Sequence, residues 1–131
     1  MKDPYKLLIV DDSKLIRRAI SNIFTDQENI QVVGEASNGR EALEILPELN
    51  PDVVTLDINM PVMDGLTTLK HIMIKNPKPT VMLSSLTQEG ASMTFDALKY
   101  GAIDFIPKPI RNNKDSLEKQ GLDIIKKVKQ A

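Results

Sequence analysis

Four short apolar segments of this chain each lead directly into a polar or charged residue. Segments of this length, separated by stretches with helical spacing, are typical of strands buried in a parallel sheet. In an open sheet of this kind, ligands bind outside the carboxyl ends of the strands. The segments and the residues that follow them are 7–10 with Asp11 and Asp12, 53–56 with Asp57, 80–83 with Ser84, and 104–107 with Lys108. The sequence therefore predicts three carboxylates, one hydroxyl and one ammonium group at one edge of one sheet.

The stretches between these segments carry apolar residues at helical spacing. Ser13 is in the position of an N-cap for the first of them, and Pro47 predicts a kink or an early end in the second. Five strand–helix units in succession favour a doubly wound α/β fold, with helices on both faces of a parallel sheet. The predicted helices cover residues 14–24, 41–49, 66–75, 91–100 and 116–129, and one further strand is expected at 30–36.

Length and composition limit the class of protein. A chain of 131 residues has the size of one domain, so we treat 1–131 as a single domain. Its net charge of −1 lacks the strongly basic character of a nucleic-acid-binding surface. The absence of cysteine excludes disulfides, thiolate metal sites and cysteine nucleophiles. No apolar stretch reaches the roughly 20 residues of a membrane span, so we expect a cytoplasmic protein with neither a membrane nor a nucleic-acid partner.

The residue types at the strand ends suit a metal ion and a phosphoryl group. Two adjacent carboxylates with a third across the sheet are typical ligands for Mg²⁺, which prefers oxygen donors and retains several waters. A carboxylate can also act as a nucleophile itself and form an acyl phosphate. Lys108 would then supply positive charge to one phosphoryl oxygen, and Ser84 a hydroxyl donor to another. This set requires neither a separate base nor a nucleotide-binding loop.

These residues together resemble a receiver domain of two-component response regulators, the CheY-like family. The resemblance is carried by Asp11 and Asp12, the segment DINMPVMDG at 57–65, Ser84, and the Lys108–Pro109 step, and it extends from about residue 6 into the final helix. It implies a five-stranded parallel sheet of the flavodoxin-like type with strand order 2-1-3-4-5. It also implies Mg²⁺ as the cofactor, with Mn²⁺ as a substitute.

The resemblance assigns a role to each matching residue. Asp57 corresponds to the phosphorylated aspartate, Asp12 to the direct metal ligand, and Asp11 to its neighbour that acts through water. The backbone carbonyl of Asn59 corresponds to the third protein ligand. Lys108 corresponds to the lysine that contacts the phosphoryl group.

Three further positions correspond to the switch machinery of the family. Ser84 matches the switch hydroxyl, and Phe105 matches the aromatic residue that changes rotamer. Pro109 matches the residue that follows a cis peptide bond. Because Phe105 has no hydroxyl, we expect steric coupling to Ser84 without the hydrogen bond that a tyrosine would add.

A narrower resemblance points to the receiver portion of the chemotaxis methylesterases of the CheB type. It rests on LSSLT at 83–87 and on ALKYGAIDF at 97–105. No G-x-S-x-G motif occurs, so we expect no esterase activity in this chain, which is either a stand-alone receiver or the N-terminal part of a longer regulator. The implied partners are a sensor histidine kinase and a downstream effector or a linked output domain. We expect a monomer, and dimerisation on phosphorylation stays open.

Two other functions compete with the phosphoacceptor hypothesis. A magnesium-dependent phosphatase with an aspartyl nucleophile usually carries an acid two residues after that nucleophile, where this chain has Asn59. A receiver that binds partners without phosphorylation typically lacks one of the acids or the lysine, and this chain has all of them. Both patterns favour the phosphoacceptor.

Overall fold

The computed structural model describes residues 4–25, 27–58, 60–84 and 95–107, together with positions 126 and 128. Five strands form one sheet in the order β2-β1-β3-β4-β5, and every neighbouring pair is parallel. This confirms the predicted α/β class and strand order. The strands are β1 (Tyr5–Val10), β2 (Ile30–Ala36), β3 (Val53–Asp57), β4 (Thr80–Ser84) and β5 (Asp104–Pro107).

The helices begin at side-chain caps that satisfy their first amide groups. Ser13 caps α1 (Lys14–Ile23), as predicted, and Asn38 caps α2 (Gly39–Leu49). Asp64 caps α3 (Gly65–Lys75) by accepting a hydrogen bond from the Thr67 amide at 2.8 Å.

The remaining helical predictions have different outcomes. The predicted end of the second helix at residue 49 is confirmed, because α2 continues past Pro47 to Leu49 and is closed by Asn50 in the left-handed conformation. In the region 91–100, the described helical residues are 95–99. Of the last predicted helix, only positions 126 and 128 lie within the described residues, and both are helical.

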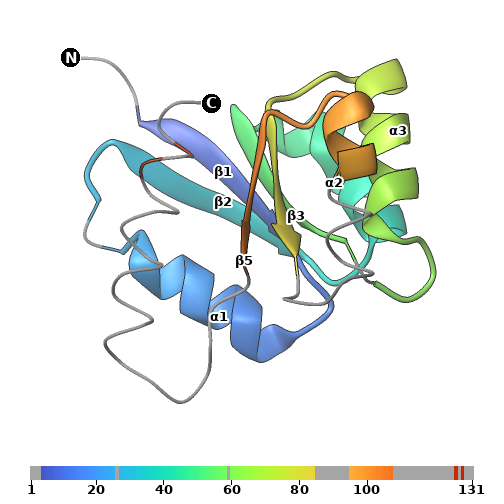
Figure 1. Cartoon of the computed structure of the whole chain (residues 1–131). Coiled ribbons are helices and arrows are strands. Elements are labelled where there is room, and N and C mark those ends of the chain that lie inside the picture. The colour runs from blue at the N-terminus through green and yellow to red at the C-terminus, as the bar shows by residue number, and fades with distance from the viewer. Residues whose placement is uncertain are drawn as a thin grey trace.

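The sheet separates two apolar layers, with α1 on one face and α2 and α3 on the other (Figure 1). Alternate strand residues point to opposite faces, so each strand contributes to both layers. The α1 layer contains Leu7, Ile9, Ile16, Ile20, Phe24, Ile30, Val53, Val81, Leu83, Ile106 and Val128. The α2 and α3 layer contains Leu8, Val10, Ala36, Ala42, Leu46, Val54, Leu56, Ile58, Leu69, Ile72, Met82, Ala97 and Ala102. Within the described part of the chain, no helix combines the length and apolar character required to cross a bilayer.

One hydroxyl group inside the α1 layer has no hydrogen-bond partner in the described part of the chain. Thr55 is fully buried on β3 between Ile9 and Val81, and its Oγ1 has no partner among the described residues. Thr80 is equally buried, but its hydroxyl donates to the Lys78 carbonyl at 2.9 Å. A buried polar group without a partner loses its hydration and regains nothing.

We therefore predict that Thr55→Val raises the free energy of unfolding by about 1 kcal/mol. The matched substitution Thr80→Val removes a hydroxyl that is hydrogen-bonded, and it should lower the free energy of unfolding by about 1 kcal/mol. Urea unfolding followed by circular dichroism measures both changes. Equal effects of the two substitutions would contradict the assignment of Thr55 as the unsatisfied group.

Candidate functional site

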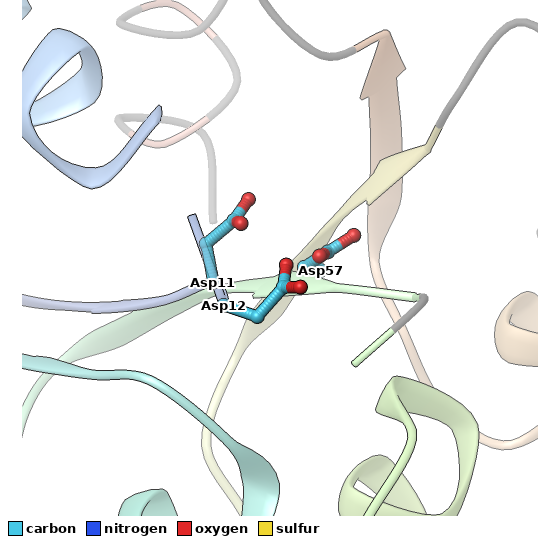
Figure 2. Close-up of side chains that lie close together, drawn as sticks. All are labelled: Asp11, Asp12 and Asp57. Carbon is cyan, nitrogen blue, oxygen red and sulfur yellow. The ribbon is translucent and has the colours of Figure 1, made fainter. Parts of the chain in front are cut away.

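Three aspartates meet at the carboxyl edge of the two central strands. Asp57 is the last residue of β3, and Asp11 and Asp12 follow the last residue of β1. The two strands are adjacent and parallel, with Val10 opposite Leu56, so the residues after them lie side by side. Figure 2 shows the three carboxylates gathered at this edge. One oxygen atom from each carboxylate lies within 4.8 Å of the other two.

The three carboxylates differ in their exposure to solvent. Asp11 and Asp57 are buried, with 0% and 1% of their surface exposed, whereas Asp12 is exposed. Buried carboxylates close to one another repel strongly, because little water screens their charges. A divalent cation that takes oxygen ligands would offset this repulsion, and three carboxylate oxygens at this spacing fit Mg²⁺. The exposed Asp12 leaves one side of the cluster open to solvent.

Backbone groups at the end of β2 and at the start of α1 hold Asp11 in place. Its amide donates to the Ala36 carbonyl at 3.0 Å, which extends the pairing of β1 with β2 by one residue. Its Oδ1 accepts a hydrogen bond from the Ser13 amide at 2.9 Å. The Ser13 hydroxyl in turn accepts from the Ile16 amide at 3.3 Å, so the cap of α1 and the position of Asp11 are set together.

The loop between β3 and α3 holds the backbone of Asp57. The Ile58 amide donates to the Leu83 carbonyl at 3.2 Å, and the Gly65 amide donates to the Ile58 carbonyl at 2.7 Å. A methyl group on Gly65 would overlap the carbonyl oxygen of Asp57 and would lie 2.7 Å from the Ile58 Cα. Only glycine therefore allows α3 to begin this close to the end of β3.

The other predicted site residues lie toward β4 and β5. Ser84 is the last residue of β4 and pairs with Pro107, the last residue of β5. Lys108 follows Pro107 directly in the chain, but Lys108, Pro109 and Asn59 lie outside the described residues, as does the side chain of Ser84. The roles assigned to these four residues stay predictions.

Phe105 lies on β5 opposite Met82, between the half-buried Asp104 and the buried Ile106. Its side chain is 37% exposed. A rotamer switch requires an outward and an inward position, and the observed exposure corresponds to the outward one. Rotation of this ring during activation stays a prediction.

Sequence patterns identified only some of the residues that shape this site. Asp64 belongs to the DINMPVMDG segment, yet its carboxylate caps α3 by accepting a hydrogen bond from the Thr67 amide. Arg17, by contrast, is absent from every motif in the sequence. It nevertheless donates to the Asp11 carbonyl at 2.7 Å from one turn into α1. No sequence spacing marks such a contact, because it depends on how α1 packs against the sheet.

Comparison with known proteins identifies the family. The family model of the response regulator receiver domain matches residues 7–130. The chain belongs to this family. The receiver resemblance seen in the sequence is thereby confirmed.

The curated relatives point to one branch of response regulators. The chain is 54% identical over 104 residues to the protein-glutamate methylesterase/protein-glutamine glutaminase of Pseudoalteromonas atlantica. It is 61% identical over 104 residues to that of Archaeoglobus fulgidus. Each match covers 79% of this chain, but only 27% and 30% of the relatives. The chain thus spans less than a third of these two relatives and corresponds to their receiver part.

Solved structures of related proteins superpose closely on this chain. The response regulator domain of Thermotoga maritima CheB superposes with a TM-score of 0.87 at 42% identity, covering 98% of this chain and 96% of that one. CheY from a CheX-CheY-BeF₃-Mg²⁺ complex of Borrelia burgdorferi gives 0.79 at 34% identity, with coverages of 98% and 89%. The complex of the CheA3 P1 domain with CheY6 from R. sphaeroides gives 0.79 at 33%, with coverages of 99% and 100%.

The contact of Gly65 with the β3 end generates a prediction. Gly65→Ala adds helix propensity, yet its methyl group would displace the Asp57 backbone, so we expect the free energy of unfolding to fall by about 2 kcal/mol. Gly34→Ala is the control, because a methyl group there would meet the flexible end of the Leu49 side chain at 2.5 Å.

Thermal unfolding of both variants tests the prediction. A stabilised Gly65→Ala variant would show that helix propensity outweighs the overlap with Asp57. That result would remove the reason for glycine at the start of α3.

Proposed function

We propose that this chain is the phosphoacceptor module of a chemotaxis-type two-component system, with Asp57 as the residue that receives the phosphoryl group. The observation that carries the proposal is the cluster of three carboxylates whose oxygen atoms lie within 4.8 Å of one another. Asp57 is buried at the bottom of this cluster, while Asp12 keeps one side of it open to solvent. Membership of the receiver family supports the same assignment.

The proposed reaction is an in-line phosphoryl transfer. A carboxylate oxygen of Asp57 attacks the phosphorus of a phosphohistidine, a P–O bond forms, and the P–N bond to the imidazole breaks. The transferred group carries negative charge on its outer oxygens, so the site must supply positive charge and hydrogen-bond donors. Lys108 and Ser84, which follow Pro107 and end β4 respectively, are the proposed donors.

Asp12, Asp57, the Asn59 carbonyl and, through water, Asp11 would hold Mg²⁺ or, as a substitute, Mn²⁺. The cation, when bound, neutralises charge on the phosphoryl oxygens and offsets repulsion among the carboxylates. The three carboxylates supply the oxygen donors that such a cation prefers. A neighbouring receiver, CheY of Borrelia burgdorferi, crystallised as a complex with BeF₃ and Mg²⁺, which supports the choice of metal.

The proposed output is a change of surface. Phosphorylation of Asp57 would draw the Ser84 hydroxyl inward, and the exposed Phe105 ring would move into the space that Ser84 leaves. Both residues lie on adjacent strands whose register places Ser84 opposite Pro107 and Met82 opposite Phe105. Ser84 therefore lies beside Pro107, two residues from Phe105 along β5. A shift of Ser84 would thus affect the position of the Phe105 ring.

We propose that residues 1–131 form one receiver unit without enzymatic output of their own, located in the cytoplasm. The relatives named as methylesterases are about three times as long as this chain. An esterase activity would therefore belong to a linked domain. The proposed phosphodonor is a histidine kinase, supported by the neighbouring complex of CheY6 with the CheA3 P1 domain. Nucleic acid is not among the proposed partners, and dimerisation on phosphorylation stays open.

The test is intact-mass measurement after incubation with acetyl phosphate, with and without Mg²⁺. We expect one phosphoryl adduct in the wild type only when Mg²⁺ is present, because the carboxylates otherwise repel the anionic donor. The adduct should disappear with hydroxylamine, which cleaves acyl phosphates, and should be absent in the Asp57→Asn variant. Asp52→Asn is the control, since Asp52 lies at the opposite end of β3.

Two outcomes would contradict the proposal. A folded wild type that binds Mg²⁺ and yet forms no adduct with acetyl phosphate or with a phosphorylated kinase domain would favour an interaction module independent of phosphorylation. Rapid multiple turnover of acetyl phosphate would instead favour an aspartyl phosphatase.

A further inference from the structure

The side chain of Arg17 joins α1, the edge strand β2 and the acidic turn after β1. Its Nη1 donates to the Asp11 carbonyl oxygen at 2.7 Å, and its Nε donates to Oε1 of Glu35 at 3.2 Å. The Arg17 side chain is 15% exposed, and that of Glu35 is 43% exposed. The guanidinium is planar and rigid, so two bonds from it fix the relative positions of both acceptors.

The Asp11 carbonyl is a group on which the geometry of the acidic cluster depends. The pairing of β1 with β2 ends with the bond from the Asp11 amide to the Ala36 carbonyl. The next peptide group, between Asp11 and Asp12, is outside that ladder, and its orientation sets the direction of the Asp12 side chain. The bond from Arg17 holds this peptide group, while the bond from the Ser13 amide holds the Asp11 carboxylate.

Asp12 depends on this backbone restraint more than its two neighbours do. Asp11 and Asp57 are buried and therefore surrounded by packed atoms, but Asp12 is exposed. The Asp12 side chain makes no hydrogen bond or ion pair within the described ranges of the chain. Its carboxylate is thus placed by the backbone, and the backbone is held from one side by Arg17.

We infer that Arg17, oriented by Glu35, is a positioning residue that presets Asp12 for binding of the divalent cation. The inference rests on the proposed function, because it concerns the metal site of the same acidic cluster. Residues that orient metal ligands without touching the metal typically change its affinity by 10-fold to 100-fold when substituted. Arg17 has the contacts expected of such a residue, namely a charge-assisted bond to the ligand turn and an acidic partner that fixes its own orientation.

The positive charge of Arg17 affects Mg²⁺ affinity in the direction opposite to its hydrogen bond with the Asp11 carbonyl. Substitutions of Arg17 can separate the two effects. A positive charge near three carboxylates repels an incoming cation, so loss of that charge alone would tighten Mg²⁺ binding. Loss of the restraint on the Asp11 carbonyl would instead weaken binding. Arg17→Lys keeps the charge but lacks the planar fork, and Arg17→Gln removes both.

The experiment is an NMR titration of the ¹⁵N-labelled chain with MgCl₂, which measures the Mg²⁺ dissociation constant of each variant. We expect Arg17→Lys to weaken binding by about tenfold. Arg17→Gln should weaken it less, because loss of the positive charge offsets part of the lost restraint. The controls are Arg18→Lys and Arg18→Gln, because Arg18 is the next residue of α1, exposed, and its side chain makes no hydrogen bond or ion pair within the described residues. We expect the controls to bind Mg²⁺ like the wild type.

A second readout requires no metal. Amide hydrogen exchange of Ser13 in the metal-free protein reports the order of the Asp11–Ser13 turn, whose bond to Asp11 Oδ1 would open more often without Arg17. We expect faster exchange at Ser13 in both Arg17 variants and unchanged exchange at Ile72 in the distant core. Glu35→Gln should have a smaller effect of the same sign, because the amide oxygen still accepts from Nε.

The outcomes separate the inference from the proposed function. Wild-type affinity and wild-type Ser13 exchange in Arg17→Lys would overturn the positioning role and leave the receiver chemistry intact. A wild type that binds no Mg²⁺ would overturn the proposed metal site and, with it, this inference. Urea unfolding of each variant verifies that the measured changes are not loss of the fold.

Discussion

The close approach of three carboxylates is the constraint on which the rest of this structure depends. Like charges whose oxygens lie within 4.8 Å repel one another, and burial of Asp11 and Asp57 removes the water that would screen them. The folded chain tolerates this arrangement because packed strands below and capped helices beside it fix the backbone. The donor set of this cluster is the one on which the proposed binding of a divalent cation rests.

The parallel sheet provides the geometry for this arrangement. Its strands all end at the same edge, and the order β2-β1-β3-β4-β5 places the two acid-bearing strands, β1 and β3, at the centre. The apolar residues before each acid are buried on both faces, so the strand ends cannot move without disturbing two layers. Gly65 and Ser13 then allow α3 and α1 to begin close to that edge. Rigid support of this kind suits a site that requires accurate positioning.

Family membership and the geometry answer different questions about this chain. The match over residues 7–130 identifies a receiver, and the similarity to methylesterases indicates the branch of response regulators. The contacts of Arg17 and Glu35 are a detail of this structure that the family match does not specify. They connect the edge strand β2 to the acidic turn after β1 through a single side chain.

The sequence by itself determined the fold class, the strand order through its family resemblance, and the identity of the three acids. It could do so because apolar strands and capped helices are local patterns, and parallel strands necessarily end together. It also placed the end of the second helix at Leu49, as the structure has it. A proline near the end of a helix, here Pro47, loses one hydrogen bond without ending the helix when apolar neighbours such as Leu46 remain packed. Only the tertiary structure revealed three contacts or groups: the hydrogen bonds of Arg17 to Asp11 and Glu35, the unsatisfied hydroxyl of Thr55, and the contact of Gly65 with Asp57. These depend on distances between elements far apart in the chain, and no pattern of neighbouring residues encodes such distances.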